Sequence, residues 1–189
     1  MGRIVVTEFV SLDGVIEAPG GGEAFKHAGW TFAINRGPEG DQFKVEETRT
    51  SEALLLGRVT YEGFAAAWPS REGEFADKFN SMPKYVVSST LKSPTWANST
   101  VLRGDVVREA SRLKAERRGD IVVHGSAQLV QTLIEHDLVD ELRLMLFPVV
   151  LGSGKRLFGE THGKKTLRLI DSKTVGDGVA ILIYRPAPA

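Results

Sequence analysis

Three features are absent from this chain: cysteine, an excess of charge of either sign, and long apolar runs. Without cysteine among its 189 residues it can form no disulfide, thiolate–zinc or iron–sulfur site, which suits a reducing compartment. Its 24 basic and 24 acidic residues cancel, so no net field attracts nucleic acid. No apolar run reaches membrane-spanning length, and the N-terminus has no signal-peptide core. We therefore expect a cytoplasmic protein with no nucleic-acid partner, no membrane partner and no metal.

The composition is that of a single globular domain spanning 1–189. Apolar residues make up 42% of the chain and charged residues 25%, which is ordinary for one well-filled core. Strand-like runs alternate with helical spacing, which predicts a mixed α/β sheet covered on both faces. Gly176-Asp177-Gly178 predicts a C-terminal antiparallel hairpin. Strands are expected at 3–10, 53–56, 84–87, 100–102, 121–123, 142–151, 167–175 and 179–185, with helices beginning near Asp41, Gly57, Glu74, Asp105 and Gly125.

The apolar run at 142–151 is long for one strand and contains Pro148. Proline cannot donate a hydrogen bond in a central ladder, so it predicts a bulge or a sheet edge. An exposed apolar edge favours pairing with a second copy of the chain. We therefore expect a homodimer formed through the 142–158 region.

Three predicted strands end in residues suited to phosphate. Gly57-Arg58 follows one strand, Ser88-Ser89 follows another, and Gly125-Ser126 opens a helix after a third. In an α/β sheet such exits lie along one edge, where ligands bind. A guanidinium with two hydroxyls would suit a 2′-phosphate, and a helix N-terminus would suit a pyrophosphate. The sequence thus predicts a dinucleotide site, although no predicted strand is followed by a GxGxxG or GxxxxGK[ST] motif.

These segments also resemble a known family. SLDGVI at 11–16, LLLGRVTYEGF at 54–64, VVSSTL at 86–91 and the run that opens VVHGSAQLVQTL and ends at 158 follow the order of the dihydrofolate reductase superfamily. They are most similar to its branch that includes the C-terminal reductase domain of riboflavin-biosynthesis enzymes. The resemblance implies a three-layer α-β-α dihydrofolate reductase-like fold that binds NADPH in its crevice. The cofactor-binding residues that it implies are Phe9, Ile16, Gly57, Arg58, Thr60, Ser88, Ser89, Gly125, Ser126, Ala127 and Gln128.

Two positions depart from the family pattern. The family's glycine pair, often joined by a cis peptide, reads His124-Gly125 here, so we expect a cis bond or a strained backbone. The family's pterin-binding acid falls nearest Asp41, which is alternatively a helix N-cap. Asp41 and Asp13 are the candidate catalytic residues for protonating a reduced product. The glycine-rich loop at 15–29 either covers the substrate or is a loose connection.

The resemblance implies an NADPH-dependent reductase that transfers hydride to a small heterocyclic substrate. The activity is most like that of 5-amino-6-(5-phosphoribosylamino)uracil reductase in riboflavin biosynthesis. However, the chain carries no deaminase domain with zinc-ligand spacing, and a fold alone does not assign a substrate. We therefore leave the substrate unassigned. A dihydrofolate or pterin reductase and a non-catalytic dimeric nucleotide-binding protein are the alternatives.

Overall fold

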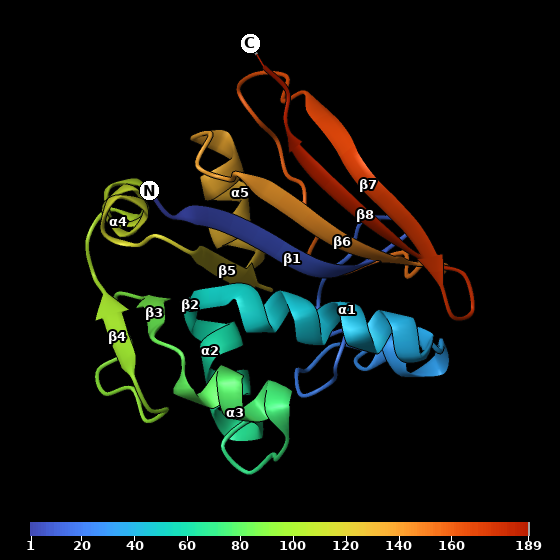
Figure 1. Cartoon of the computed structure of the whole chain (residues 1–189), viewed down its shortest axis with the longest axis horizontal. Coiled ribbons are helices and arrows are strands. Elements are labelled where there is room, and N and C mark those ends of the chain that lie inside the picture. The colour runs from blue at the N-terminus through green and yellow to red at the C-terminus, as the bar shows by residue number, and fades with distance from the viewer. Residues whose placement is uncertain (189) are drawn as a thin grey trace.

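The computed structural model describes residues 1–188, which fold around an eight-stranded sheet (Figure 1). In chain order the strands are β1 (Arg3–Ser11), β2 (Ser51–Gly57), β3 (Lys84–Val87), β4 (Ser99–Leu102), β5 (Asp120–His124), β6 (Glu141–Phe147), β7 (Leu167–Val175) and β8 (Val179–Pro186). The helices are the 3-10 helix η1 (Trp30–Ala33), α1 (Gly37–Thr50), α2 (Arg58–Ala67), α3 (Glu74–Ser81), α4 (Val106–Glu116) and α5 (Ala127–Glu135).

The strand order is β4-β3-β2-β5-β1-β6-β8-β7. Strands from β4 to β6 are parallel, β8 is antiparallel to β6, and β7 is antiparallel to β8. The predicted mixed sheet and C-terminal hairpin are confirmed, and Figure 1 shows the hairpin along one side of the molecule. Because β1, β2, β3 and β5 run in the same direction, their carboxyl ends lie at one edge of the sheet.

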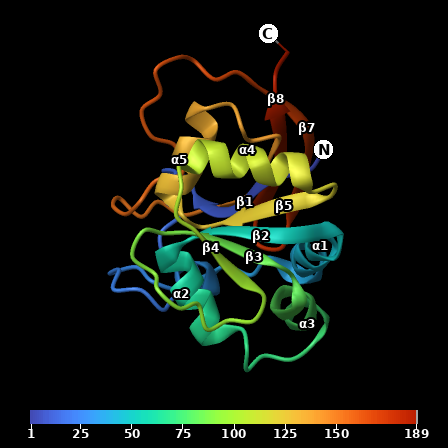
Figure 2. The same ribbon diagram turned by 90° about the vertical axis from the view of Figure 1, so that its left-hand side faces the viewer.

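Helices cover both faces of the sheet, so the fold has the predicted three layers. On one face, Leu113 of α4 and Leu133 of α5 pack against apolar residues of β1 and β5. On the other face, Tyr61 of α2 and Phe79 of α3 pack against β2. Figure 2 shows α4 and α5 on one side of the strands and α1 and α3 on the other. Burial on both faces explains why β2 and β5 are almost continuously apolar rather than alternating.

The side chains of the central strand β1 alternate between these two layers. Val6 and Val10 join the core beneath α4 and α5. Thr7 and Phe9 point to the opposite layer, where both approach Lys44 of α1. Glu8 therefore lies on the α4 and α5 side of the sheet.

The structure overturns the expected edge strand at 142–151. β6 ends at Phe147, one residue before Pro148, and it pairs with β1 on one side and β8 on the other. Its residues are apolar because both faces are covered, and Pro148 begins a loop in which no ladder hydrogen bond is needed. Within residues 1–188 the edges of the sheet are β4 and β7.

Helix α1 begins four residues earlier than its pattern indicated. Gly37 starts the helix, Pro38 occupies its first turn and Arg36 is the N-cap. The alternative role of Asp41 as an N-cap is therefore wrong. Among residues 1–188, no helix is long and apolar enough to cross a membrane.

Candidate active site

A large cleft opens where β1, β2, β3 and β5 end. Its volume is about 1,940 Å³, and all three predicted turns line it. Pockets for single small ligands occupy roughly 300–1,000 Å³, so this cleft has room for an extended dinucleotide and a second molecule. The residues that line it include six basic and four acidic side chains: Arg36, Lys44, Arg58, Arg71, Lys155 and Arg156, with Glu8, Glu17, Glu23 and Asp41.

Hydrogen bonds join the turn after β2 to the turn after β5. The N–H of Gly57 donates to Ser126 Oγ at 2.8 Å, and Ser126 Oγ lies 3.0 Å from Thr60 Oγ1. A Cβ on Gly57 would lie 3.2 Å from Ser126 Oγ, and one on Gly125 would lie 2.8 Å from Thr60 Oγ1. Residue 125 must therefore be glycine, because φ is 56° and the added Cβ would clash, whereas a Cβ on Gly57 would force Ser126 to shift slightly.

Two helices begin at these turns without a side-chain cap. Gly57, before α2, has no side chain with which to cap the helix. Ser126, before α5, makes no capping hydrogen bond with its side chain. The first N–H groups of a helix have no partner within it, and the helix dipole adds positive potential there. Both starts line the cleft, including Ala127 and Gln128 at the head of α5. The cleft is thus suited to phosphate groups.

The turn at His124-Gly125 is strained but not cis. Among residues 1–188 no peptide bond is cis, so the cis alternative is wrong. The chain instead turns with φ of 56° at Gly125 and 61° at Ser126, and a left-handed serine costs about 1–2 kcal/mol. The half-buried ring of His124 packs against Phe64 and Phe79. Desolvation lowers the pKa of His124 well below its ordinary value, so this ring is neutral near pH 7.

Arg58, the first residue of α2, has a partly exposed guanidinium at the cleft. Its Nη1 lies 2.8 Å from Glu62 Oε2, one helical turn further along. Such an exposed i,i+4 pair contributes only about 0.3–0.5 kcal/mol. Arg58 can therefore leave Glu62 for a phosphate at little cost.

The turn after β3 is built around Ser88. Its Oγ accepts hydrogen bonds from the N–H groups of Thr90 (3.1 Å) and Leu91 (2.9 Å), so it caps its own turn. The neighbouring Ser89 is exposed and also lines the cleft. Arg103, which follows β4, donates to the carbonyls of Ser89 (3.3 Å) and Leu91 (2.7 Å). A second guanidinium, which the sequence did not indicate, thus adjoins this turn.

Phe9 and Ile16 also line the cleft, beside the loop at 15–29. The guanidinium of Arg36 and the ammonium of Lys44 lie 5.1 Å and 5.5 Å from the centre of the Phe9 ring. Within the loop, Ile16 is almost fully buried. These contacts hold the two apolar residues in place at the wall of the cleft.

Asp13 lies outside the residues that line the cleft. Its carboxylate accepts hydrogen bonds from Ser11 Oγ (2.6 Å) and from the N–H groups of Leu151 (3.1 Å) and Gly152 (2.8 Å). These bonds, that from Ser11 first, lower the pKa of Asp13 to about 2. Such a carboxylate holds no proton to donate near neutral pH, so the geometry argues for a role in joining two loops rather than in catalysis.

Asp41 lines the cleft from α1 and is 64% exposed. Its Oδ1 accepts from Arg36 Nε at 2.6 Å. Asp41 is therefore placed to accept a hydrogen bond from a bound molecule.

Sequence reasoning missed the buried charges beneath the cleft. Lys44 donates to Thr7 Oγ1 at 2.8 Å and forms an ion pair with Glu47. Glu47 also lies 3.6 Å from Arg143 on β6. Glu8, on β1, is 4% exposed and lines the cleft. The signal that could have identified it is a glutamate inside the otherwise apolar strand IVVTEFV.

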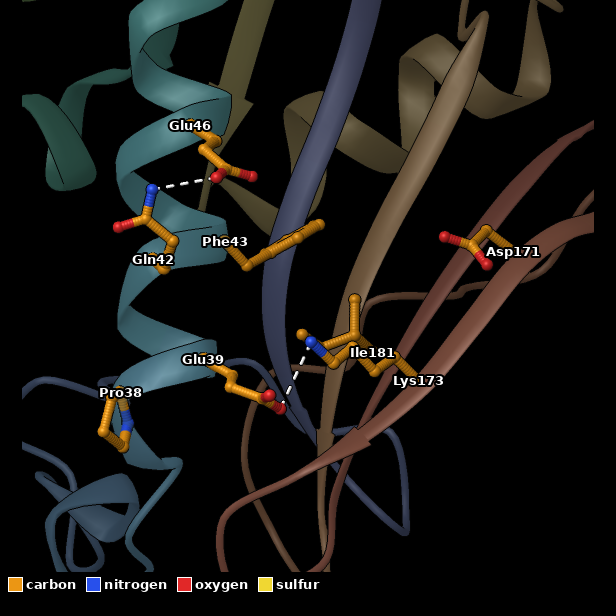
Figure 3. Close-up of a pocket in the computed structure, with 8 residues that line it drawn as sticks. All are labelled: Pro38, Glu39, Gln42, Phe43, Glu46, Asp171, Lys173 and Ile181. Carbon is orange, nitrogen blue, oxygen red and sulfur yellow. Dashed lines mark hydrogen bonds and ion pairs between the residues drawn. The ribbon is translucent and has the colours of Figure 1, made fainter.

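A second, smaller cavity of about 580 Å³ lies between α1 and the β7–β8 hairpin. Phe43 and Ile181 provide its apolar surface, and Glu39 approaches Lys173 across it at 3.2 Å (Figure 3). It contains none of the predicted site residues. The larger cleft is therefore the candidate active site.

The chain matches the RibD C-terminal domain family model over residues 3–181. It is similar to two proteins of Bacillus subtilis (strain 168). YyaP is 28% identical over 187 residues, covering 96% of this chain and 94% of YyaP, and YwjB is 30% identical over 176 residues, covering 93% and 94%.

Two crystal structures share the fold. One is the "Putative riboflavin biosynthesis protein" from Shewanella sp. PV-4, with a TM-score of 0.78 and 23% identity over 98% of this chain and 99% of that one. The other is a pyrimidine reductase-like protein from Corynebacterium diphtheriae, with a TM-score of 0.70 and 12% identity over 99% and 92%.

Proposed function

The chain belongs to the RibD C-terminal domain family, and we propose that it is an NADPH-dependent reductase of a small heterocyclic substrate. The observation that carries the proposal is the single cleft of about 1,940 Å³ onto which two uncapped helix starts, at Gly57 and Ser126, both open. A ligand with several phosphates and an extended shape, such as a dinucleotide, could use both starts at once.

Each of the three turns would bind a different group of NADPH. The start of α5, at Ala127 and Gln128, would hold the pyrophosphate. Arg58, with Ser89, would hold the 2′-phosphate, which is the group that distinguishes NADPH from NADH. The Ser88 hydroxyl shapes that turn and keeps its own proton available to a phosphate oxygen. Phe9 and Ile16 would border the nicotinamide, which supplies the hydride when bound.

The substrate would enter beside Phe32 and Asp41. Phe32 is 78% exposed and lines the cleft, so it presents a flat apolar face to solvent that a heterocyclic ring could cover. Asp41, which already accepts from Arg36, would accept a second hydrogen bond from a ring N–H. The names of the two similar crystal structures favour a pyrimidine over a pterin. A dihydrofolate reductase, and a nucleotide-binding protein without activity, are the competing functions.

Titration with NADPH and NADH, followed by cofactor fluorescence, tests the proposal. We expect NADPH to bind more tightly, and NADPH oxidation to begin on addition of 5-amino-6-(5-phosphoribosylamino)uracil but not of dihydrofolate. Faster NADPH oxidation with dihydrofolate would indicate that the substrate is a pterin. Binding without oxidation by either compound would favour the non-catalytic function, and no binding at millimolar cofactor would refute the cofactor assignment.

We also propose that the protein is a homodimer, formed through a surface other than an edge in 142–151. In the 142–158 region, Val150 is 67% and Phe158 is 49% exposed. The edge strand β7 exposes Leu167, Leu169 and Ile170. A row of unpaired backbone groups flanked by exposed apolar side chains is the feature that a second copy would cover.

A further inference from the structure

Glu8 is a buried acid with an unsatisfied oxygen at the wall of the cleft. Its residue is 4% exposed, and within residues 1–188 its Oε1 has no hydrogen-bond partner. It lies beside Leu144 of β6 in the sheet register and on the same face as Val6 and Val10. An apolar side chain would be more stable among these neighbours, because burying an unpaired carboxyl costs about 1–3 kcal/mol. The acid is therefore not explained by packing.

The other carboxyl groups that line the cleft each have a basic partner. Asp41 pairs with Arg36 at 2.6 Å. Glu17 lies 3.2 Å and Glu23 lies 3.9 Å from Lys155 Nζ. Each of these three carboxyl groups thus lies beside a cation. Among the residues that line the cleft in the described part of the chain, Glu8 is the one carboxyl without an ion pair.

The surroundings of Glu8 favour its neutral form by raising its pKa. Burial raises its pKa well above the ordinary value, while the Gly125 N–H and the Lys44 ammonium lower the pKa and Glu47 raises it. On β5 the adjacent His124 is neutral, since its own pKa is lowered. On the α5 side, the one titratable residue of that helix is Glu135, whose carboxylate binds His162 at the far end.

β5 ends at His124, opposite Thr7, so beyond that point residues from both faces of β1, Glu8 and Phe9, line the cleft. We propose that Glu8 is the acid of this site and donates its proton to the bound substrate through this opening. The inference rests on the proposed reductase activity. The substrate C=O or C=N carbon gains hydride, and so two electrons, from NADPH, which becomes NADP⁺. The substrate oxygen or nitrogen gains a proton from the Glu8 carboxyl, which becomes a carboxylate. Water entering through the cleft then protonates Glu8 again.

The first test needs no ligand and uses thermal unfolding from pH 4.5 to 9 of the wild type, Glu8→Gln and Glu72→Gln. The Glu8 pKa is higher in the folded than in the unfolded protein, so between the two values the folded state binds more protons. Wild-type stability therefore falls as pH rises through that window. Glu8→Gln lacks this loss, so its melting temperature should gain about 3 °C per pH unit over wild type.

Glu72 is exposed on a loop, so Glu72→Gln should follow the wild type at every pH. If the difference in melting temperature between Glu8→Gln and wild type stays constant above pH 5, the proposal is overturned, because Glu8 would then be ionised at neutral pH. If Glu8→Gln does not fold, Glu8→Leu, which has no acid and suits the apolar neighbours Val6, Val10 and Leu144, serves for the same comparison.

The second test determines whether Glu8 lies beside the ligand, by measuring NADPH affinity as a function of pH. Bound phosphates and the exclusion of water both favour the neutral carboxyl, so binding raises the Glu8 pKa. At pH values above the Glu8 pKa of the free protein, binding therefore takes up a proton. Wild-type affinity for NADPH should fall with rising pH by up to about tenfold per unit relative to Glu8→Gln. Parallel pH profiles for the two proteins would place Glu8 away from the ligand and overturn the inference.

The third test is turnover of the substrate that the wild type reduces. Glu8→Gln should lower kcat by about 10²–10⁴-fold with little change in KM, while NADPH still binds. Unchanged kcat would overturn the inference and leave the reductase assignment intact. An inactive wild type with a Glu8 proton detected by unfolding would instead refute the reductase assignment and, with it, the proton transfer to substrate.

Discussion

The backbone N–H of Gly57 donates to Ser126 Oγ at 2.8 Å, although the two residues are 69 positions apart in the chain. This bond fixes the start of α2 against the start of α5. Because one hydroxyl holds both helix starts, their N–H groups face the cleft in a preset geometry. A phosphate-bearing ligand then meets an organised site, which reduces the entropy lost on binding.

The close approach of the two turns predicts a steric coupling between Gly125 and Thr60. Gly125→Ala should destabilise the protein by about 1–3 kcal/mol, because φ is 56° and the new Cβ would lie 2.8 Å from Thr60 Oγ1. Thr60→Ala in the same chain should recover part of this loss by removing that oxygen. Urea unfolding of the double-mutant cycle measures the coupling. Gly63→Ala, whose Cβ meets nothing within 4 Å, is the matched control and should be neutral or stabilising. Strict additivity of the two substitutions would contradict the packing described.

Arg58 should be the main determinant of cofactor choice. Arg58→Ala should weaken NADPH binding about 10-fold to 100-fold and change NADH binding little, since a lost charge-assisted hydrogen bond costs roughly 1.5–3 kcal/mol. Cofactor fluorescence titration measures both constants. Arg112→Ala is the control, because Arg112 is also a helical arginine paired with glutamates, Glu109 and Glu116, but lies on α4 and outside the cleft lining. Equal losses for NADPH and NADH would show that Arg58 does not contact the 2′-phosphate.

The low pKa of Asp13 predicts an acid-dependent contribution to stability. Its pKa is lowered to about 2 in the folded protein, so the folded state binds the proton less well than the unfolded state. The stabilisation by Asp13 is therefore full above its ordinary pKa near 4 and is lost as pH falls towards 2. Asp13→Asn should melt below the wild type at pH 7, and the difference should shrink through that window. A pH-independent difference would mean that the hydrogen bonds from Leu151 and Gly152 do not need the charge.

The homodimer proposal predicts that a charge on its surface will produce monomers. Leu169→Glu on β7 and Val150→Glu in the 142–158 region place a carboxylate on two separate exposed apolar positions. Multi-angle light scattering should show a dimer for the wild type and a monomer for the variant whose residue is covered. A monomeric wild type at working concentration would refute the dimer, and dimers in both variants would place the interface elsewhere.

Local patterns were sufficient for most of the elements. Asp105 followed by helical spacing predicted α4, and its side chain does accept from the Arg108 N–H. The start of α3 and both limits of β3 agree with the predicted ones, and Pro83 separates the two elements. Patterns failed where the outcome depended on neighbours distant in sequence. An apolar run such as 142–147 is the same at an edge and in a central strand, and only its pairing with β1 and β8 distinguishes the two.

By itself, the sequence determined the mixed sheet, the C-terminal hairpin and the three small-residue turns, since glycine, proline and apolar spacing act over a few residues. Tertiary structure alone decided what each acidic group does. Asp13 became a loop-joining carboxylate through Leu151 and Gly152, and Asp41 became an exposed partner of Arg36. Glu8 has a raised pKa because strands and helices from elsewhere in the chain exclude water from it. Charge state depends on surroundings assembled across the whole fold, and no local pattern records them.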